Sequence, residues 1–525
     1  MMLENRVTVI DGRLTEIERD ERRIKLHDDA VVKYEILVLT MGLNDSVLQT
    51  MGRVSRGIAP VPEGKQYLDG IISIDDPYIY QHFRPDGNIM AVLNHRKQPG
   101  TTVVYGFTLH VFCFIQGLIS KGISPKRIKV VIPPVEFEEE EGVDPLFGGD
   151  ENVLANHPAF ENDEVLEKKV LDNLDQLGIQ VLKGYSIKSI NIDEKNNLSS
   201  LVLTSPEEER VLNCKVLVTA GKVDVDHEIF YAIHNNGLVF NGRVIVNNQF
   251  LTTDPNIYAA GSLCEFSQQF KHLSPGRCLR MDRYNGREIG VKLARSMLSM
   301  LDLDILKGLF EDTKEEMPYF YMPRGKGGVL PGGYFYYFIL APKYADPKEL
   351  RDKPKNRPDV VSDTIKQDSD GSVTGHYIKF TFSNIGLVES VTYFSKEQIE
   401  VQSLWRFVGL SETYLNKLSE RFNSKLLPDV AEFLSENWAM ALYHDKFAEF
   451  STDIKVELKQ QIGNVSDAVK VMVDARQEFT REHYKKLRDM VGKETRRMVQ
   501  ERTLKYIKSH LNHLPMYYIP GVEFA

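Results

Sequence analysis

Apolar residues in the first part of the chain group into short strands. Residues 7–10 predict one strand, and residues 34–42 form a nearly continuous apolar run that ends on Gly42. A loop rich in glycine and proline follows over residues 52–64. A short run of apolar residues closed by glycine is typical of a buried strand in a parallel sheet.

A second group of apolar residues predicts a strand, a helix and another strand in succession. The strand at 102–105 meets Gly106, the helix covers 109–120, and the next strand covers 128–132. An acidic run at 138–141 then breaks the pattern into a loop. This order favours a parallel, doubly wound sheet.

The pattern continues with an amphipathic helix over residues 162–177. Further strands and a closing helix are predicted at 186–192, 198–204, 216–221, 237–246, 256–261 and 287–301.

Beyond residue 302 the composition shifts and helices become more frequent. A glycine-rich loop, strands and a charged, proline-punctuated linker precede the helices, at 324–333, 334–340, 342–358, 375–382 and 387–394. Helices dominate from residue 396, and 467–510 is a long, highly charged helical pattern with a basic second half.

Composition narrows the class of protein. The net charge of −9 argues against general binding to nucleic acid or to an anionic membrane, since both require a basic surface. The chain starts without a signal peptide and has no run of about eighteen apolar residues, so we expect a cytoplasmic protein. The four cysteines have the spacing of neither a disulfide framework nor a zinc site, at Cys113, Cys214, Cys264 and Cys278.

Five segments, in this order, resemble motifs of the pyridine-nucleotide disulfide-oxidoreductase family. They are the strand at 34–42, the proline-rich stretch at 58–62, the strand and glycine at 103–106, the strand at 216–221 and the turn at 253–261. The resemblance implies an α/β fold with two Rossmann-like domains, one for FAD and an inserted one for NAD(P).

The NAD(P) fingerprint of this family is altered in the chain. If Gly106 is the first glycine, the second and third positions fall on Thr108 and Val111. A side chain at either position hinders the close approach of backbone, pyrophosphate and helix that the glycines allow. Pro133 stands where the family has the acidic residue that binds the ribose.

The FAD motif is altered too. It closes on Gly261, and Ser262 replaces its terminal aspartate. The glycine-rich unit that would hold the FAD pyrophosphate and the redox-active cysteine pair after it are absent, because the chain starts beyond them. The chain could be a fragment or short isoform, or the fold could lack the unit. We favour the former, because a sheet without its central strand exposes apolar edges.

The resemblance also implies a division into domains. They are a remnant of the FAD-like domain (1–85), the inserted NAD(P)-like Rossmann domain (86–225), the return of the FAD-like domain (226–301), an α+β domain (302–450) and a charged helical tail (451–525).

Segments 103–110 and 436–445 resemble a family of cilia- and flagella-associated proteins, and the similarity runs along essentially the whole chain. This resemblance implies the C-terminal portion or a short isoform of a longer protein with an acetyltransferase-like region upstream. It implies a structural component of radial spokes in motile cilia and sperm flagella. Expected partners are other radial-spoke subunits, subunits of the calmodulin- and spoke-associated complex, and calmodulin.

Three other features of the sequence bear on binding or chemistry. The basic amphipathic pattern at 485–508 could bind calmodulin or an acidic helix, although packing on its own domain is the simpler interpretation. The segment 324–333 lacks the spacing of a phosphate loop and is predicted to be a flexible connector. The histidines at 444, 510 and 513 form no recognisable triad or metal site.

We therefore expect a non-catalytic protein without a metal site and with no cofactor. Gly106, Thr108, Val111, Gly261 and Ser262 would be vestigial cofactor positions. Two alternatives remain: a divergent FAD- or NAD(P)-dependent oxidoreductase, and a nucleotide-sensing module that binds weakly without turnover.

Overall fold

The computed structural model of the chain contains two compact units. Unit 1 is Met1–Phe320 with two short later stretches, and unit 2 is the remainder. The structure describes residues 7–48, 70–75, 83–84, 90, 93, 100–134, 159–161, 163–193, 197–221, 223–270, 278–301, 316–342, 358–367, 373–399, 401–415, 418–425, 427, 429–435, 447–461 and 493–510.

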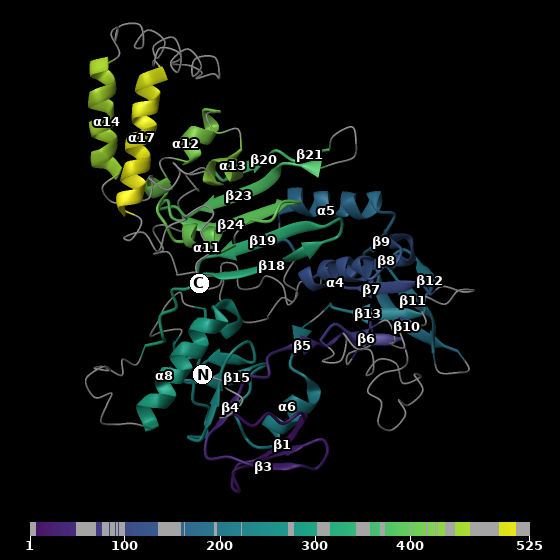
Figure 1. The fold of residues 1–525 in the computed structure, drawn as a ribbon. Coiled ribbons are helices and arrows are strands. Elements are labelled where there is room, and N and C mark those ends of the chain that lie inside the picture. The colour runs from purple at the N-terminus through teal and green to yellow at the C-terminus, as the bar shows by residue number, and fades with distance from the viewer. Residues whose placement is uncertain are drawn as a thin grey trace. The chain divides into compact units, whose positions relative to one another are not determined.

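A five-stranded parallel sheet forms the NAD-like part of unit 1 (Figure 1). Its order is β6-β13-β7-β8-β9, and its strands are β6 (Ile71–Ser73), β13 (Val216–Thr219), β7 (Thr102–Tyr105), β8 (Ile128–Ile132) and β9 (Gln180–Lys183). The predicted parallel α/β sheet is confirmed. The expected boundary at residue 86 falls after β6, so this sheet begins earlier in the chain than that boundary.

Two helices follow strands of this sheet as the apolar periodicity predicts. Helix α4 (Leu109–Ser120) buries one apolar stripe and ends before Gly122, whose φ of +86° suits glycine. Helix α5 (Glu164–Gln176) is capped by Asp163, which accepts a hydrogen bond from the Leu166 amide at 3.1 Å. A 3-10 turn, η2 (Pro125–Arg127), precedes β8.

A second, antiparallel sheet shares a hydrophobic core with the parallel sheet. It consists of β10 (Ser186–Ile192), β11 (Leu198–Thr204) and β12 (Glu209–Asn213). Leu201 and Leu203 from β11 and Leu212 from β12 are buried in one cluster with Val103 and Leu217 of the parallel sheet. Burial of these alternate side chains fixes the register of the strands.

The FAD-like part of unit 1 is built from short strands around its own core. Its elements are β1 (Leu14–Glu18), β2 (Arg23–Leu26), β3 (Val31–Lys33), β4 (Leu37–Leu39), β15 (Val244–Val246), β16 (Ile257–Ala259), β17 (Cys264–Phe266), α6 (His227–His234), η3 (Met281–Arg283) and α8 (Gly286–Leu301). Strands β1, β2 and β3 form an antiparallel sheet, whereas β4 pairs with β16 and β15 with β17 in parallel.

The two connectors between these parts of unit 1 pair with each other. Strand β5 (Asn44–Asp45) lies in the first connector and β14 (Val223–Asp224) in the second, and they form an antiparallel ribbon.

Unit 2 contains a five-stranded antiparallel sheet of order β18-β19-β24-β23-β20 and several helices (Figure 1). The elements are β18 (Arg324–Leu330), β19 (Tyr334–Leu340), β20 (Val360–Asp363), β21 (Lys366–Gln367), β22 (Val373–Thr374), β23 (His376–Phe382), β24 (Val388–Ser395), α11 (Val401–Phe407), η4 (Glu412–Leu415), α12 (Leu418–Asn423), α13 (Val430–Ser435), α14 (Phe447–Gln461) and α17 (Lys493–His510). The sheet shares one apolar core with residues of α11, α12 and α13.

Strand β18 corrects the prediction that residues 324–333 are a flexible connector. A β-carbon on Gly325 would lie 2.5 Å from Cζ3 of Trp405, and one on Gly327 would lie 2.5 Å from Cδ1 of Tyr337. The glycines therefore allow two aromatic rings to lie against the strand backbone. Their low strand propensity had concealed the strand in the sequence.

Helices α14 and α17 pack on each other. The rings of Phe450 and Tyr506 stack with centroids 4.4 Å apart, and Arg502 forms an ion pair with Glu457. Of the predicted helical segments 467–510 and 485–508, the structure describes the part from Lys493 onward. Segments 52–64, 58–62, 138–141 and 436–445 lie outside the described residues.

Three general features bear on the class of protein. All four cysteines are free thiols. No helix in the described ranges combines the length and apolar character that a membrane crossing requires. Within the same ranges, no three His, Cys, Asp or Glu side chains are grouped so that they could hold a metal ion.

Candidate functional site

The turn between β7 and α4 is where the NAD(P) fingerprint should bind pyrophosphate. Gly106 has a φ of +135°, and its amide donates to the carbonyl of Val131 at 3.0 Å. A β-carbon at this position would lie 2.3 Å from the carbonyl oxygen of Ala220. The close packing of the strand ends therefore requires this glycine whether or not a nucleotide binds.

Thr108 connects this turn to the neighbouring strand end. It occupies the N-cap position of α4 in an extended conformation, yet its side chain caps no helix amide. Its Oγ1 instead donates to the carbonyl of Ala220 at 3.1 Å. The second fingerprint position thus carries a side chain that joins the turn to the end of β13, where a dinucleotide-binding turn needs bare backbone.

The third fingerprint position is part of the core. Val111 is 0% exposed and is buried on α4 together with Phe112 and Ile115. Helix α4 therefore packs through a branched side chain at the position where the family's glycine brings helix and strand close together.

Aromatic rings gather around the first turn of α4. The ring centroids of Phe107 and Phe112 are 5.8 Å apart, those of Phe112 and Phe160 are 5.1 Å apart, and those of Phe107 and Phe160 are 6.3 Å apart. Such a cluster supplies no hydrogen-bond donor to a phosphate group.

Pro133 directly follows β8 and is partly buried. It has no carboxylate to accept hydrogen bonds from a ribose, and it has no backbone N–H. Pro133, Thr108 and Val111 together make the residues at the carboxyl ends of β7 and β8 a poor fit to NAD(P).

The closing turn of the FAD motif retains its backbone form. The amide of Ala260 donates to the carbonyl of Leu39 at 3.0 Å, which extends the pairing of β16 with β4. Gly261 follows with a φ of +86°, and Oγ of Ser262 lies 3.5 Å from where a β-carbon of Gly42 would be. The structure thus brings the ends of two predicted motifs together. A neutral hydroxyl stands where the family has a carboxylate, so this turn lacks the charge of an FAD site.

A buried carboxyl group that the sequence analysis missed lies at the carboxyl end of the parallel sheet. Asp45 is 4% exposed and accepts hydrogen bonds from Thr219 Oγ1 at 2.6 Å and from the Gly221 amide at 2.9 Å. The pKa of Asp45 is raised to about 6, chiefly by burial and in smaller part by the nearby Asp75 carboxylate, although the hydrogen bonds from Thr219 and Gly221 oppose the rise. The residues that bind it are far away in the sequence, so no local motif could have revealed it.

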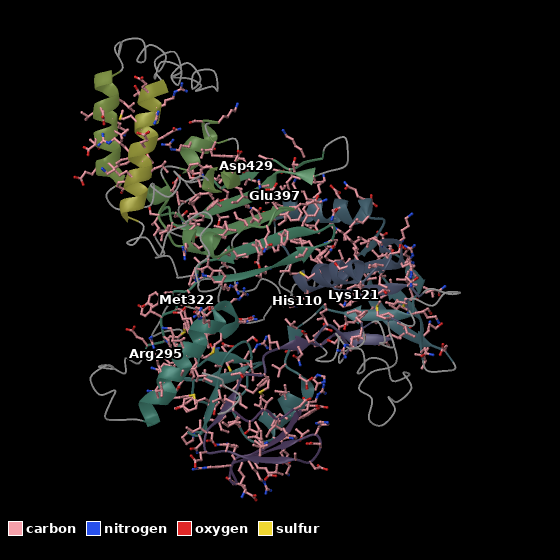
Figure 2. The ribbon with its side chains drawn as sticks, viewed as in Figure 1. His110, Lys121, Arg295, Met322, Glu397 and Asp429 are labelled. Atoms are coloured by element: carbon pink, nitrogen blue, oxygen red, sulfur yellow. The ribbon has the colours of Figure 1, made fainter. Side chains whose placement is uncertain are left out.

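A second polar cluster missed by the sequence analysis lies in unit 2. His376 lies between Asp429 and Glu397, with Nδ1 3.2 Å from Asp429 Oδ2 and Nε2 3.2 Å from Glu397 Oε2; both acids are labelled in Figure 2. Thr364 Oγ1 donates to the same Asp429 oxygen at 2.5 Å. The Thr364 hydroxyl is bonded to the acid and to the backbone of His376, but not to the imidazole ring, so this group is not a nucleophile–base pair.

Charge and hydrogen bonding shift both pKa values in this cluster. The hydrogen bond to Asp429 raises the pKa of His376, although burial opposes it. Burial would raise the pKa of Asp429, but hydrogen bonds from His376 and Thr364 lower it to about 2. Asp429 also accepts from the amides of Ala431 and Glu432 at the start of α13. The cluster therefore stabilises the junction of strand and helix.

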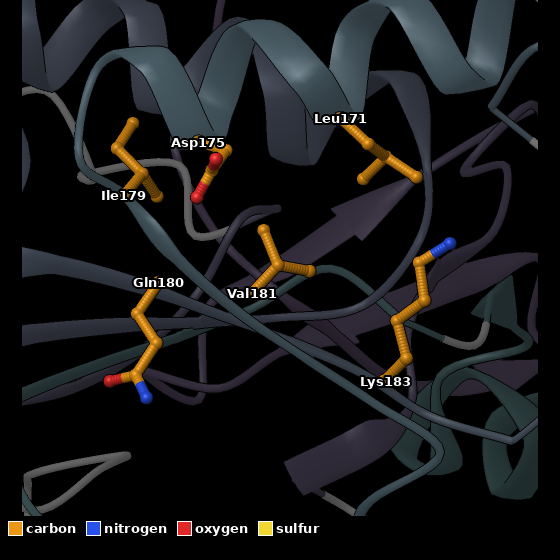
Figure 3. Close-up of a pocket in the computed structure, with 6 residues that line it drawn as sticks. All are labelled: Leu171, Asp175, Ile179, Gln180, Val181 and Lys183. Atoms are coloured by element: carbon orange, nitrogen blue, oxygen red, sulfur yellow. The ribbon is translucent and has the colours of Figure 1, made fainter.

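One shallow cavity of about 310 Å³ lies between α5 and β9 (Figure 3). Its lining residues are Leu171, Asp175, Ile179, Gln180, Val181 and Lys183. Lys183 forms an ion pair with Glu167 at 3.3 Å, and none of the fingerprint positions lines the cavity.

Two known protein families match different parts of the chain. Residues 153–277 match the family Pyridine nucleotide-disulphide oxidoreductase, and residues 318–442 match the CFAP61 dimerisation domain. The first match begins after the β7–α4 turn.

The chain is 36% identical over 99% of its length to Cilia- and flagella-associated protein 61 of Tetrahymena thermophila. It spans about a third of that protein, covering 36% of its length.

Solved structures of reductases are more distant. The ferredoxin reductase for the CYP199A2 system from Rhodopseudomonas palustris has a TM-score of 0.43 and 17% identity, with 75% of each chain covered. The NAD-dependent persulfide reductase from A. fulgidus has a TM-score of 0.47 and 13% identity, over 77% of this chain and 63% of that one.

The resemblances to the ciliary proteins and to the pyridine-nucleotide disulfide-oxidoreductases, both predicted from the sequence, are confirmed. The strand order of the parallel sheet and the match of residues 153–277 support the reductase fold. The chain is a relative of cilia- and flagella-associated protein 61, built in part on the fold of the pyridine nucleotide-disulphide oxidoreductases.

Proposed function

We propose that the protein is a non-catalytic structural component of the axoneme in motile cilia or sperm flagella, in which a reductase fold acts as a scaffold. The observation that carries this proposal is the β7–α4 turn. Thr108 is hydrogen-bonded to Ala220 at 3.1 Å, and Val111 is buried in the core. Both side chains contribute to packing at positions that a dinucleotide site keeps bare.

Similarity to a ciliary protein supports the location. We propose that the protein acts at radial spokes within the calmodulin- and spoke-associated complex and is needed for spoke assembly and motility. Its partners would be other subunits of the spokes and of this complex, with calmodulin as a further candidate. The match of residues 318–442 to a domain named for dimerisation supports self-association through unit 2.

The alternative is a divergent oxidoreductase or a nucleotide-sensing module that still uses the β7–α4 turn. One substitution distinguishes the alternatives. His110 is exposed at the second residue of α4 (labelled in Figure 2), and His110→Asp would place a carboxylate at the helix N-terminus. A carboxylate at a helix N-terminus interacts favourably with the helix dipole, but it would repel the pyrophosphate of a bound nucleotide.

The test is rescue of ciliated cells that lack the protein. Wild-type protein and His110→Asp should restore swimming speed equally, and cryo-electron tomography should show the spoke density missing in the deletion and present in both rescued lines. Normal spokes in the deletion line would contradict the spoke role. Failure of His110→Asp alone, at equal protein level, would favour the nucleotide-binding alternative.

A further inference from the structure

Two adjacent strands of the parallel sheet end in polar side chains that both donate hydrogen bonds to one carboxyl group. Ser73 and Thr219 are the last residues of β6 and β13, and they lie opposite each other in the sheet register. Thr219 Oγ1 donates to Asp45 Oδ2 at 2.6 Å, and Ser73 Oγ donates to the same oxygen at 3.4 Å. Asp45 therefore contacts the carboxyl edge of the parallel sheet through two strands at once.

Asp45 also contacts the second connector. Its Oδ1 accepts from the Gly221 amide at 2.9 Å, and it pairs with Val223 in the β5–β14 ribbon. A β-carbon on Gly221 would lie 2.8 Å from Cγ2 of Val47, so the first connector packs closely on the second. Val47 is partly buried against the core that the two sheets of the NAD-like part share.

Parallel α/β sheets receive their ligands at the carboxyl ends of their strands, through backbone amides and short polar side chains. Here the same kinds of groups bind a carboxylate of the chain itself. We propose that Asp45 is an internal latch, a carboxyl group that takes the place of a ligand at this edge and holds both connectors on the NAD-like sheet.

Burial of Asp45, together with a neighbouring carboxylate, makes the strength of the latch depend on pH. The Asp45 amide donates to Asp75 Oδ2 at 2.6 Å, which places a second carboxylate beside the first. On β14, Asp224 is exposed and lies 3.6 Å from Arg243, and the Tyr105 ring at the end of β7 lies near Gly221. Of these groups, Asp75 is the one whose charge acts on the pKa of Asp45.

Burial raises the pKa of Asp45 to about 6 in the latched state, above the ordinary value near 3.8 that an exposed Asp45 would have. The latched state therefore binds the proton more tightly, and latching strengthens as the pH falls through about 6. The linkage relation gives a latching constant roughly tenfold larger at pH 5 than at pH 7.

Hydrogen exchange with mass spectrometry tests the latch in the full chain. Peptides covering 40–48 and 217–226 are followed between pH 5 and 7.5, with rates corrected for intrinsic exchange, and peptides from β11 and β12 report that the fold is intact. Protection of the connectors in the wild type should fall about tenfold from pH 5 to pH 7. Asp45→Asn should remove this pH dependence, and Asp45→Ala should remove the protection at every pH.

Thr219→Val provides a second test that does not depend on the stability of the Asp45 variants. Loss of a hydrogen bond that lowers the pKa of Asp45 should move the midpoint of the pH profile upward. Unchanged connector protection in Asp45→Ala, or the same pH profile in wild type, Asp45→Asn and Thr219→Val, would overturn the proposal.

Discussion

The substitution Val111→Ala tests whether the third fingerprint position has become part of the hydrophobic core. Val111 is 0% exposed, so alanine removes two fully buried methyl groups. At about 0.8 kcal/mol for each carbon, the lost transfer free energy is about 1.6 kcal/mol, and the cavity left behind brings the expected cost to about 2–3 kcal/mol. Because the site is a packed core, this variant should gain no affinity for NADH.

The assay is urea denaturation, with two signals that separate the units. Both tryptophans, Trp405 and Trp438, lie in the sequence range of unit 2, so their fluorescence reports on that unit. Far-UV circular dichroism follows both units. Val111→Ala should lower the unfolding free energy of unit 1 and leave the fluorescence midpoint in place.

His110→Ala, an exposed change in the same turn, is the matched control and should cost less than about 0.5 kcal/mol. Equal stabilities of the two variants would show that Val111 is not part of the core, and measurable NADH binding by Val111→Ala would show that the turn still forms a nucleotide site.

Two further predictions concern backbone packing and charge. Gly106→Ala should cost more than about 3 kcal/mol of folding free energy or prevent folding, because its β-carbon would lie 2.3 Å from the carbonyl oxygen of Ala220. Gly117→Ala, in the open middle of α4, should instead stabilise the protein by about 0.5–1 kcal/mol. Thermal unfolding measures both changes. The raised pKa of His376 means that its pairing with Asp429 stabilises fully below the ordinary histidine pKa and fades as the pH rises through the raised value. His376→Gln should therefore cost about 1–2 kcal/mol at pH 5.5 and clearly less at pH 8.5, and the same loss at both values would contradict this account.

Local patterns in the sequence were enough to predict much of the fold. The helix at 109–120 and the strands at 186–192 and 198–204 have the predicted bounds, because apolar periodicity and flanking turn residues are short-range signals. Strand β18 was missed because its glycines are required by Trp405 and Tyr337, which follow later in the chain. Contacts of this kind leave no local signal.

The residues of the candidate site could likewise be predicted only in part from the sequence. Thr108 and Val111 could be singled out because the fingerprint has fixed spacing within one turn. Asp45 could not, since its partners Ser73 and Thr219 are 28 and 174 residues away. A lone aspartate after an asparagine reads as an ordinary turn residue until the fold buries it.

We propose that this relative of a ciliary protein uses a reductase fold without the cofactor chemistry of reductases. The most direct measurement is the visible absorption spectrum of the protein purified from motile cilia. We expect no flavin band near about 450 nm and no flavin released on denaturation. A band corresponding to one flavin per chain, bleached by NADH or NADPH, would contradict it.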